Sequence, residues 1–373
     1  MSVRLKPLEE QVIVITGATS GIGLVTARMA AERGARVVLS ARNREALAEV
    51  AEDIRKAGGD AVHCVADVAN ETEMQQLAAA AIHAFGAFDT WVNNAGVSIY
   101  GRIADVSMED HRRLFETNYW GVVNGSRIAM QHLRRSRGAI INLGSVASDR
   151  AIPLQGPYSA SKHAVKAFTD ALRMELEAEG AAVSVTLIKP AAIDTMYEAH
   201  AKNLLDSEPV NPPPVYAPEL VAEGILHAAE TPVRDLYIGG ASKMFTLAET
   251  LAPRLTDYVM ERQLTRAQRA GGPKQPRKDS LHSPGDDGHE RAGRHGFVRE
   301  TSLYSSARMH PWASAALVAG FGILAGAAVS RGWARQNHSE DRVGDADHHR
   351  RELGHNAKPA HTATQETEVT FTE

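Results

Sequence analysis

The stretch Thr16-Gly17-Ala18-Thr19-Ser20-Gly21-Ile22-Gly23 decides the fold of this chain. It follows the β-branched run Val12–Ile15, which predicts a buried strand, and it leads into a predicted helix over Leu24–Glu32. In this context glycine lets the backbone approach a pyrophosphate, and the start of the helix offers unpaired N–H groups. The strand, turn and helix therefore predict a dinucleotide site, in preference to a glycine-rich turn that holds no ligand.

Strands and helices continue to alternate to about residue 190. This alternation is typical of an α/β fold with a doubly wound parallel sheet. The chain has 373 residues, of which 43% are hydrophobic, so it can bury a sizeable core. The formal net charge of -4, with no large basic block, argues against a nucleic-acid partner.

A second motif, Tyr158-Ser159-Ala160-Ser161-Lys162, begins 13 residues after Ser145. A tyrosine and a lysine four residues apart share one face of a helix. An ammonium near a phenol lowers the phenol pKa from about 10, which makes the phenol a usable acid and base near neutral pH. Such a pair is more often a simple surface pair, but the dinucleotide motif upstream favours a catalytic function.

Together these motifs resemble the short-chain dehydrogenase/reductase family in its compact single-domain branch, over about residues 8–240. The resemblance implies a Rossmann-type fold and hydride transfer between a nicotinamide cofactor and a carbonyl. It makes Tyr158 the acid/base and Lys162 the group that lowers its pKa and binds the nicotinamide ribose. It makes Ser145 a contact of the substrate oxygen, and Asn118 the residue that holds a water in the proton relay.

The resemblance also implies cofactor contacts from the glycine-rich turn, the later strand ends and the catalytic helix: Gly17, Thr19, Ser20, Gly21, Ile22, Gly23, Asp67, Val68, Asn94, Ala95, Gly96, Tyr158, Lys162, Pro190, Ile193 and Thr195. Asp67 matches the family's adenine contact, and the Thr195 hydroxyl could reach the carboxamide. One position departs from the family, because Ala191 stands where glycine usually follows the proline. Alanine lacks glycine's access to positive φ, which puts the geometry of this loop in doubt.

The end of the second predicted strand, Ser40-Ala41-Arg42, indicates which cofactor binds. An NAD site places a carboxylate here for the ribose 2′-OH, and this stretch has none. A guanidinium instead pairs well with a 2′-phosphate. We therefore predict NADP(H) in preference to NAD(H), with Ser40 and Arg42 as contacts. The alternative is that Arg42 only caps a solvated loop.

The segments that build the substrate pocket in this family supply mostly apolar side chains here: Ile99, Tyr100, Ile152, Leu154, Met196 and Tyr197. An apolar lining favours a hydrophobic alcohol and its ketone or aldehyde as substrates. The proline-rich stretch Pro209–Pro218 is expected to end a lid over this pocket. The alternative functions are an NADPH-binding redox sensor and a membrane scaffold with little turnover, although a pure binder needs no proton relay.

The chain changes character after a last predicted strand that begins at Leu236. Helical apolar spacing over Phe245–Arg269 predicts a helix that could pack on the core, form a subunit contact or lie on a membrane surface. We divide the chain into a Rossmann-fold catalytic domain, a flexible linker, a transmembrane helix and a disordered polar tail: residues 1–268, 269–310, 311–330 and 331–373.

The predicted membrane anchor carries no charge from Ala313 to Ser330 and is bracketed by Trp312 and Trp333. The alternative is a buried Ala/Gly-rich helix of the soluble domain. We expect the catalytic domain to face the cytoplasm, because NADPH is found there and no signal peptide is visible. The only cysteine, Cys64, is expected to be a core residue. No metal site is predicted, and the family resemblance implies a homo-oligomer.

Overall fold

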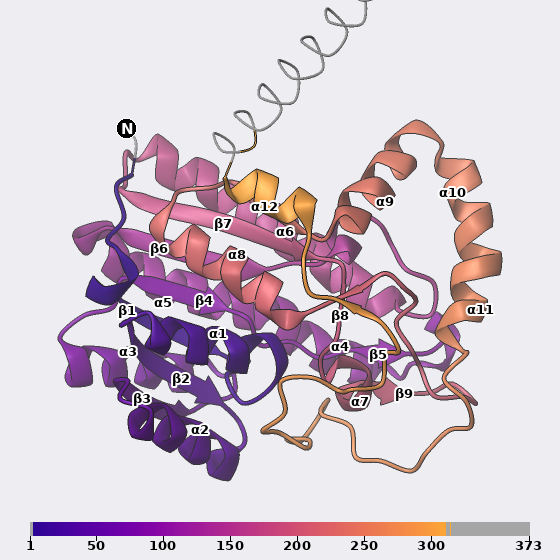
Figure 1. Ribbon diagram of the computed structural model, residues 1–373, viewed down its shortest axis with the longest axis horizontal. Coiled ribbons are helices and arrows are strands. Elements are labelled where there is room, and N and C mark those ends of the chain that lie inside the picture. Colours follow the sequence, from indigo (N-terminus) through magenta and orange to yellow (C-terminus); the bar gives the residue numbers. More distant parts are fainter. Residues whose placement is uncertain (1–2, 311–313, 315–373) are drawn as a thin grey trace, which may run out of the picture. The chain divides into compact units, whose positions relative to one another are not determined.

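The computed structural model describes residues 3–310 and Ser314. A seven-stranded sheet, parallel throughout, forms its centre in the order β11-β7-β6-β4-β1-β2-β3 (Figure 1). The strands of this sheet are β1 Val12–Thr16, β2 Arg36–Ala41, β3 Ala61–Val65, β4 Thr90–Asn93, β6 Gly138–Leu143, β7 Val183–Pro190 and β11 Asp235–Ile238. The strand order reverses direction between β1 and β4, and this is the point at which open α/β sheets bind their ligands.

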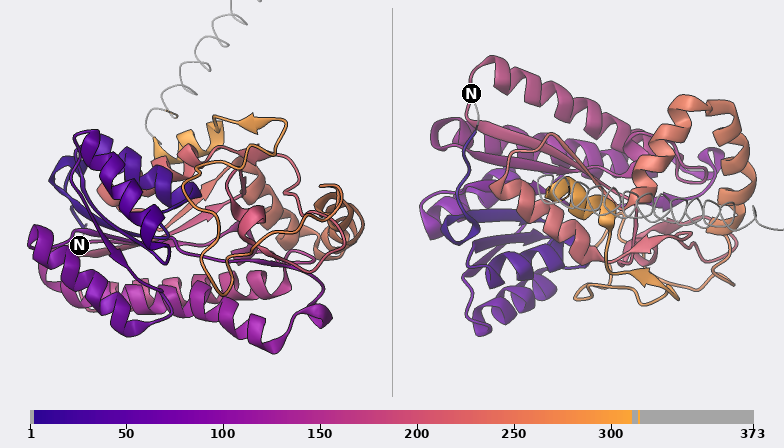
Figure 2. Two further views of the ribbon diagram at one scale, coloured as in Figure 1. Left: turned by 90° about the horizontal axis from the view of Figure 1, so that it is seen from below. Right: turned by 45° about the horizontal axis from the view of Figure 1, so that its top comes forward.

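Helices cover both faces of the sheet. Those that pack on it or extend beyond it are α1 Gly21–Glu32, α2 Arg44–Lys56, α3 Glu71–Phe85, α4 Met108–Phe115, α5 Gly121–Ser136, α6 Gly156–Ala178, α7 Tyr197–His200, α8 Pro218–Glu230, α9 Gly240–Leu251, α10 Pro253–Val259, α11 Thr265–Gln268 and α12 Leu303–Met309. The alternation of side chains along β1 explains the two layers, since successive residues of a strand point to opposite faces. Ile13 and Ile15 pack with α1, α2 and α8, whereas Val12 and Val14 pack with α3, α5 and α6. The views of Figure 2 show helices on both faces of the sheet. The predicted doubly wound parallel sheet is confirmed.

Two small sheets lie outside the main one. One pairs β5 (Ile99–Tyr100) with β9 (Lys202–Asn203), and the other places β10 (Val215–Tyr216) between β8 (Ala192–Ile193) and β12 (Val298–Arg299). Because β8 directly follows β7, this second sheet extends the carboxyl edge of the main sheet.

Residues 269–310 differ from the flexible linker that the sequence predicts. Leu281 is fully buried, β12 pairs with β10, and α12 contacts α8 and β11. The compact unit that contains the sheet accordingly extends to Met309. The polar composition of this segment is compatible with packing because its charged side chains pair with the domain; Arg277 and Arg294, for example, both reach Glu208.

The helix predicted over Phe245–Arg269 is interrupted. It consists of α9, α10, a π-helical turn over Met260–Leu264 and α11, which together form an arm beside the sheet (Figure 1). The break between α9 and α10 falls at Ala252, because Pro253 disfavours helical geometry at the residue before it. Within the described residues, no helix is both long and apolar enough to cross a membrane. The predicted anchor at 311–330 and the tail at 331–373 lie outside those residues, apart from Ser314.

Candidate active site

Tyr158 and Lys162 lie one turn apart on α6, and both side chains are buried. The Lys162 ammonium lies 5.8 Å from the centre of the Tyr158 ring and donates a hydrogen bond of 2.6 Å to the Leu143 carbonyl at the end of β6. Burial lowers the pKa of Lys162 from 10.5 to about 8. The helix and the strand end therefore hold the two predicted catalytic side chains together.

Burial also raises the pKa of the Tyr158 phenol, although hydrogen bonds with Ser145 and Tyr197 act in the opposite direction. This differs from the expectation that Lys162 lowers that pKa, because at 5.8 Å from the ring the ammonium does not offset burial. Ser145 and Tyr197 are therefore the hydroxyl groups that interact with the Tyr158 phenol. The sequence listed Tyr197 only as an apolar wall of the pocket.

Ser145 lies just beyond the carboxyl end of β6 and caps a short 3-10 turn, Val146–Ser148. Its hydroxyl accepts the Ala147 N–H at 3.1 Å, and its own N–H donates to the Ser148 hydroxyl at 3.1 Å. This reciprocal capping fixes the backbone of the serine. The serine hydroxyl is thereby held at the Tyr158 oxygen.

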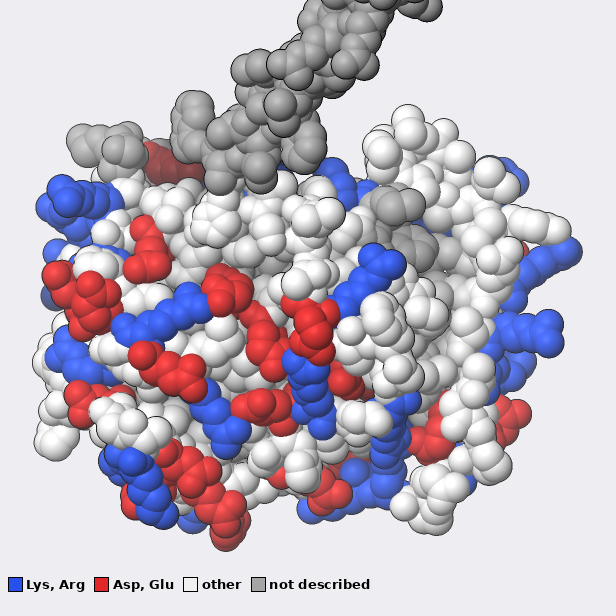
Figure 3. Space-filling model, in the orientation of Figure 1, with Lys and Arg blue, Asp and Glu red and all other residues white. Residues whose placement is uncertain are grey.

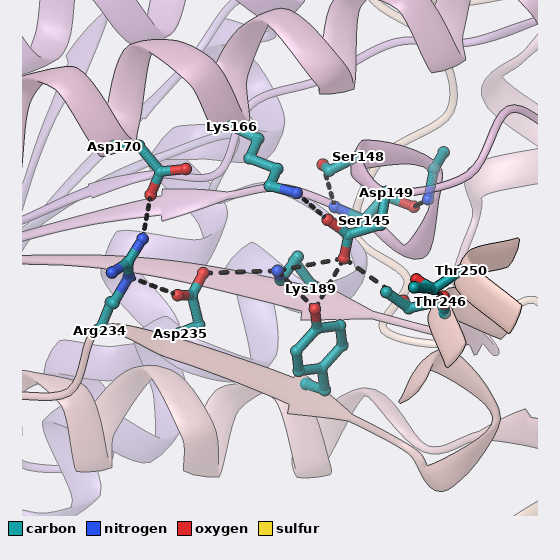
Figure 4. A network of polar contacts seen from close by, with 12 residues as sticks. Ser145, Ser148, Asp149, Lys166, Asp170, Lys189, Arg234, Asp235, Thr246 and Thr250 are labelled. Atoms are coloured by element: carbon teal, nitrogen blue, oxygen red, sulfur yellow. Dashed lines mark hydrogen bonds and ion pairs between the residues drawn. The ribbon is translucent and has the colours of Figure 1, made fainter. Parts of the chain in front are cut away.

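The turn that carries Ser145 is tied down by a buried network around Asp149 (Figure 4). The Asp149 side chain is 2% exposed and pairs with Lys166 of α6 and with Lys189 of β7, the latter at 3.1 Å. The Tyr237 hydroxyl of β11 donates to the same carboxylate at 2.8 Å. Burial acts to raise the pKa of Asp149, but its cationic and hydroxyl partners together lower it. The network joins the serine turn to the catalytic helix and to two strands.

Asn118 lies in a π-helical turn, Glu116–Trp120, between α4 and α5. Its amide accepts the Val97 N–H at 2.8 Å and donates to the Val97 carbonyl at 2.9 Å and to the Ser161 hydroxyl at 3.1 Å. The side chain thus fastens the loop after β4 to α6. The water that Asn118 is expected to hold stays a prediction.

Most of the predicted cofactor contacts line one groove at the carboxyl edge of the sheet: Gly17, Thr19, Ser20, Gly21, Ile22, Arg42, Asp67, Val68, Asn94, Ala95, Gly96 and Thr195. A Cβ at Gly17, where φ is +67°, would lie 2.9 Å from the Ala95 Cα. Gly23 does not line the groove, but a Cβ there would lie 2.0 Å from the Gly17 carbonyl oxygen. The bare backbone turn at the start of α1 therefore fits a pyrophosphate.

Of the two predicted 2′-phosphate contacts, only one lines the groove. Arg42 lines the groove. So does Asn43, which was not predicted from the sequence as a contact and whose side chain caps α2. Ser40 was wrongly expected to join them: it is fully buried within β2, where its carbonyl accepts the Ala18 N–H at 3.1 Å. Its position in the strand, one residue before the end of β2, turns its side chain into the core.

The structure also shows the surroundings of Asp67 and of Ala191. Asp67 lines the groove, but one of its oxygens accepts a hydrogen bond of 2.6 Å from Arg113. Ala191 does not adopt a positive φ, and its N–H donates to the Ile238 carbonyl at 2.9 Å. The loop after β7 therefore accommodates alanine without strain.

A cavity of about 530 Å³ adjoins the groove and contains Ser145, Tyr158, Lys162, Pro190 and Ile193 in its lining. Of the six predicted apolar lining residues, Ile152 and Tyr197 line this cavity. Ile99 and Tyr100 are fully buried in β5, Leu154 packs against Tyr100, and Met196 lines the groove instead.

The proline-rich stretch expected over this pocket does line it, through Pro212, Pro213 and Pro214. The rest of the wall was not expected from the sequence, because the arm supplies Met260, Leu264 and Gln268. The helical apolar spacing of residues 245–269 signalled a buried face, but it did not indicate which surface that face would cover.

Comparisons with known proteins agree with this geometry. Residues 11–204 match the family described as short chain dehydrogenase. An uncharacterized oxidoreductase of Bacillus subtilis is 49% identical over 333 residues, which are 88% of this chain and 93% of the relative. The dehydrogenase/reductase SDR family member 7B of Bos taurus is 35% identical over 67% of this chain and 80% of its own. A short chain dehydrogenase from Burkholderia cenocepacia, solved in complex with NADP, superposes with a TM-score of 0.58 at 26% identity, over 68% of this chain and 99% of that one.

Proposed function

The chain belongs to the short-chain dehydrogenase family and is an oxidoreductase, and from this premise we propose that it interconverts a hydrophobic alcohol and its ketone or aldehyde with NADP(H). The observation that carries the proposal is that the groove and the cavity of about 530 Å³ adjoin. Thr195 and Tyr197 line both spaces, and Tyr158 lies in the cavity with its ring against that of Tyr197. When bound, the cofactor supplies or accepts the hydride.

Side chains of the cavity then transfer the proton to or from the substrate oxygen. The Ser145 hydroxyl orients the substrate oxygen, and Tyr158 exchanges a proton with that oxygen, since the two hydroxyls are already hydrogen-bonded to each other. Lys162, whose pKa burial lowers to about 8, keeps a cation 5.8 Å from the centre of the phenol ring, although this cation does not offset the rise that burial causes in the pKa of Tyr158. A cofactor sensor without turnover would need none of these three groups.

The choice of NADP(H) rests on Arg42, the guanidinium in the groove next to the end of β2. The NADP present in the Burkholderia relative supports the same choice. The preference for a hydrophobic substrate rests on the cavity wall, where Ile152, Met260 and Leu264 line the same cavity as Tyr158.

The test is oxidation of NADPH and of NADH by the full chain across ketones and aldehydes of rising apolar area, with small sugars as polar controls. We expect turnover with NADPH on the larger apolar carbonyls. Equal turnover of sugars would contradict the substrate class, and equal use of NADH would contradict the cofactor choice. NADPH binding with no turnover of any alcohol or carbonyl would favour the sensor function.

Two further proposals rest on the sequence and on family membership. We propose that the protein attaches to the cytoplasmic side of a membrane through residues 311–330, and that it forms a homo-oligomer. Fractionation of cells that express the full chain or the chain ending at residue 310 tests the first. Sedimentation of the shorter chain tests the second.

A further inference from the structure

Residues 280–289, which we name the strap, lie in the same groove that the cofactor is proposed to occupy. The segment that follows α11 returns past α7 to the start of α1 (Figure 1). Its residues Ser280, Pro284, Gly285 and Asp287 line the groove opposite the glycine-rich turn. The strap belongs to the region whose composition predicted a flexible linker, so this placement was not predicted from the sequence.

The strap bonds to the turn that would receive the pyrophosphate. The N–H of Gly21, the first residue of α1, donates to the His289 carbonyl at 2.9 Å. The N–H of Gly288 in turn donates to the Thr19 carbonyl at 2.8 Å. A pyrophosphate seeks the N–H groups at this helix start, so a strap carbonyl occupies a donor that the cofactor needs.

The strap also accepts the hydrogen bonds of Arg42, the residue proposed to bind the 2′-phosphate. The Arg42 guanidinium donates to the carbonyls of Ser280 and Leu281, the second at 3.4 Å. Arg113 donates to the same Leu281 carbonyl at 3.1 Å. The Asp287 carboxylate interacts electrostatically with Arg42 and would repel a phosphate. With the strap in place, the groove retains a volume of about 190 Å³, below the range of about 300–1,000 Å³ typical of ligand pockets.

Contacts outside the groove hold the strap there. Leu281 is fully buried beside Val97 and Leu114, and His282 bonds to Asp110 at 2.8 Å. Immediately after the other end, Glu290 pairs with Arg28 of α1 at 2.5 Å. Acidic and basic side chains are interleaved over this face of the molecule, as such pairing requires (Figure 3).

We propose that the strap is an autoinhibitory segment that competes with NADP(H) for the Gly21 N–H and the Arg42 guanidinium. The proposal rests on the proposed function, because the competing ligand is the cofactor assigned there. Only the fraction of molecules whose strap has left the groove binds the cofactor, so the apparent affinity is reduced by that fraction. A change that loosens the strap without touching the groove therefore tightens cofactor binding.

The experiment compares NADPH affinity in the full chain and in two variants. The first, His282→Ala with Glu290→Gln, removes contacts at the two ends of the strap and leaves the groove intact. We expect its dissociation constant to fall about 3-fold, since exposed pairs contribute little each. The second replaces residues 282–288 by a Gly/Ser run of equal length, and we expect a fall of about 10-fold or more. Glu179→Gln is the matched control. It breaks an exposed 2.8 Å ion pair with Arg134, which is remote from the strap in the sequence, and it should leave the NADPH dissociation constant unchanged.

A second readout is hydrogen exchange of residues 280–289 in the unaltered chain. Saturating NADPH should raise exchange there, and 2′,5′-ADP should do so more than 5′-AMP, because only the former carries the 2′-phosphate. Weaker NADPH binding in the loosened variants would show instead that the strap closes over the cofactor, and unchanged binding with unchanged exchange would show that it does not contact the site; either result overturns the proposal. Failure of the unaltered chain and every variant to bind NADPH would instead overturn the proposed function.

Discussion

The groove and the cavity adjoin at Tyr197, which lines both, but different chemical groups form them. The groove is lined by the turns that follow β1, β2, β3 and β4 and by the strap, with backbone donors at the start of α1, and it retains about 190 Å³. The cavity is formed by apolar side chains from separate segments, including Ile152 and Leu264, and it encloses about 530 Å³. A surface of backbone donors accepts any carbonyl or phosphate of the right shape, so the chain's own strap can fill it. A surface of side chains selects by size and polarity, so it determines the substrate.

This difference means that the two halves should respond to separate mutations. Changes in the groove should alter cofactor affinity and leave substrate preference intact, and changes in the cavity should do the reverse. The following predictions test that separation, beginning with the largest expected effect.

The Tyr158→Phe variant removes the phenol hydroxyl and keeps the ring. We expect turnover to fall by about 100-fold or more, because the proton of the substrate oxygen loses its donor. NADPH affinity should change far less, since the groove is untouched. Steady-state rates and equilibrium binding measure the two quantities, and a comparable loss in both would show that the halves are not separable here.

The Asp149→Asn variant disturbs the network that connects the Ser145 turn to α6, β7 and β11. It leaves Lys166 and Lys189 without their buried carboxylate, and we expect the free energy of unfolding to fall by about 3 kcal/mol. Because the folded pKa of Asp149 is lowered, its contribution is present above the unfolded pKa of 3.8 and is lost as the pH falls through the lower folded value. Urea unfolding between neutral pH and pH 3 should show the two proteins converging in acid, and a constant difference would refute this account.

The Arg42→Gln variant affects only the groove. We expect the preference for NADPH over NADH to fall by about 30-fold, because a charge-assisted contact to the 2′-phosphate is lost. The Michaelis constant for the ketone should stay the same. An unchanged cofactor ratio would mean that Arg42 serves the loop and the strap alone.

The Leu264→Ala variant affects only the cavity. Loss of three carbons from the wall should lower kcat/KM for a large apolar ketone by about 10-fold and spare a small one. NADPH affinity should be unaltered. Equal losses for both ketones would place Leu264 outside the substrate's path.

The His295→Gln variant should have the smallest effect, confined to a pH window. His295 lies 3.4 Å from Glu198 and 4.0 Å from Asp194, with Arg294 next to it, and its hydrogen bond to Glu198 raises its pKa. The stabilisation of the segment after the strap is thus full below the unfolded pKa of 6.5 and is lost as the pH rises through the higher folded value. We expect NADPH affinity of the unaltered chain to rise across that window and that of the variant to stay flat. Parallel pH profiles would exclude a link between His295 and the strap.

The sequence by itself determined the parallel sheet, the glycine-rich turn and the face of α6 that carries Tyr158 and Lys162. These features depend on residues close together in the chain. Gly17 and Gly23 belong to the same glycine-rich turn and lie against each other, and Tyr158 and Lys162 are one helical turn apart. Local backbone geometry and side-chain periodicity are therefore sufficient to predict them.

Only the tertiary structure decided the rest. Ser40 was expected in the groove from its place in the sequence, yet the register of β2 buries it. The arm residues Met260 and Leu264 line the cavity, and the Leu281 carbonyl reaches Arg42 across 239 positions of the chain. Contacts at such separations depend on which surfaces remain available after the sheet has formed. A polar segment whose composition indicates no core can still be held in place when its backbone finds unpaired donors at the start of a helix.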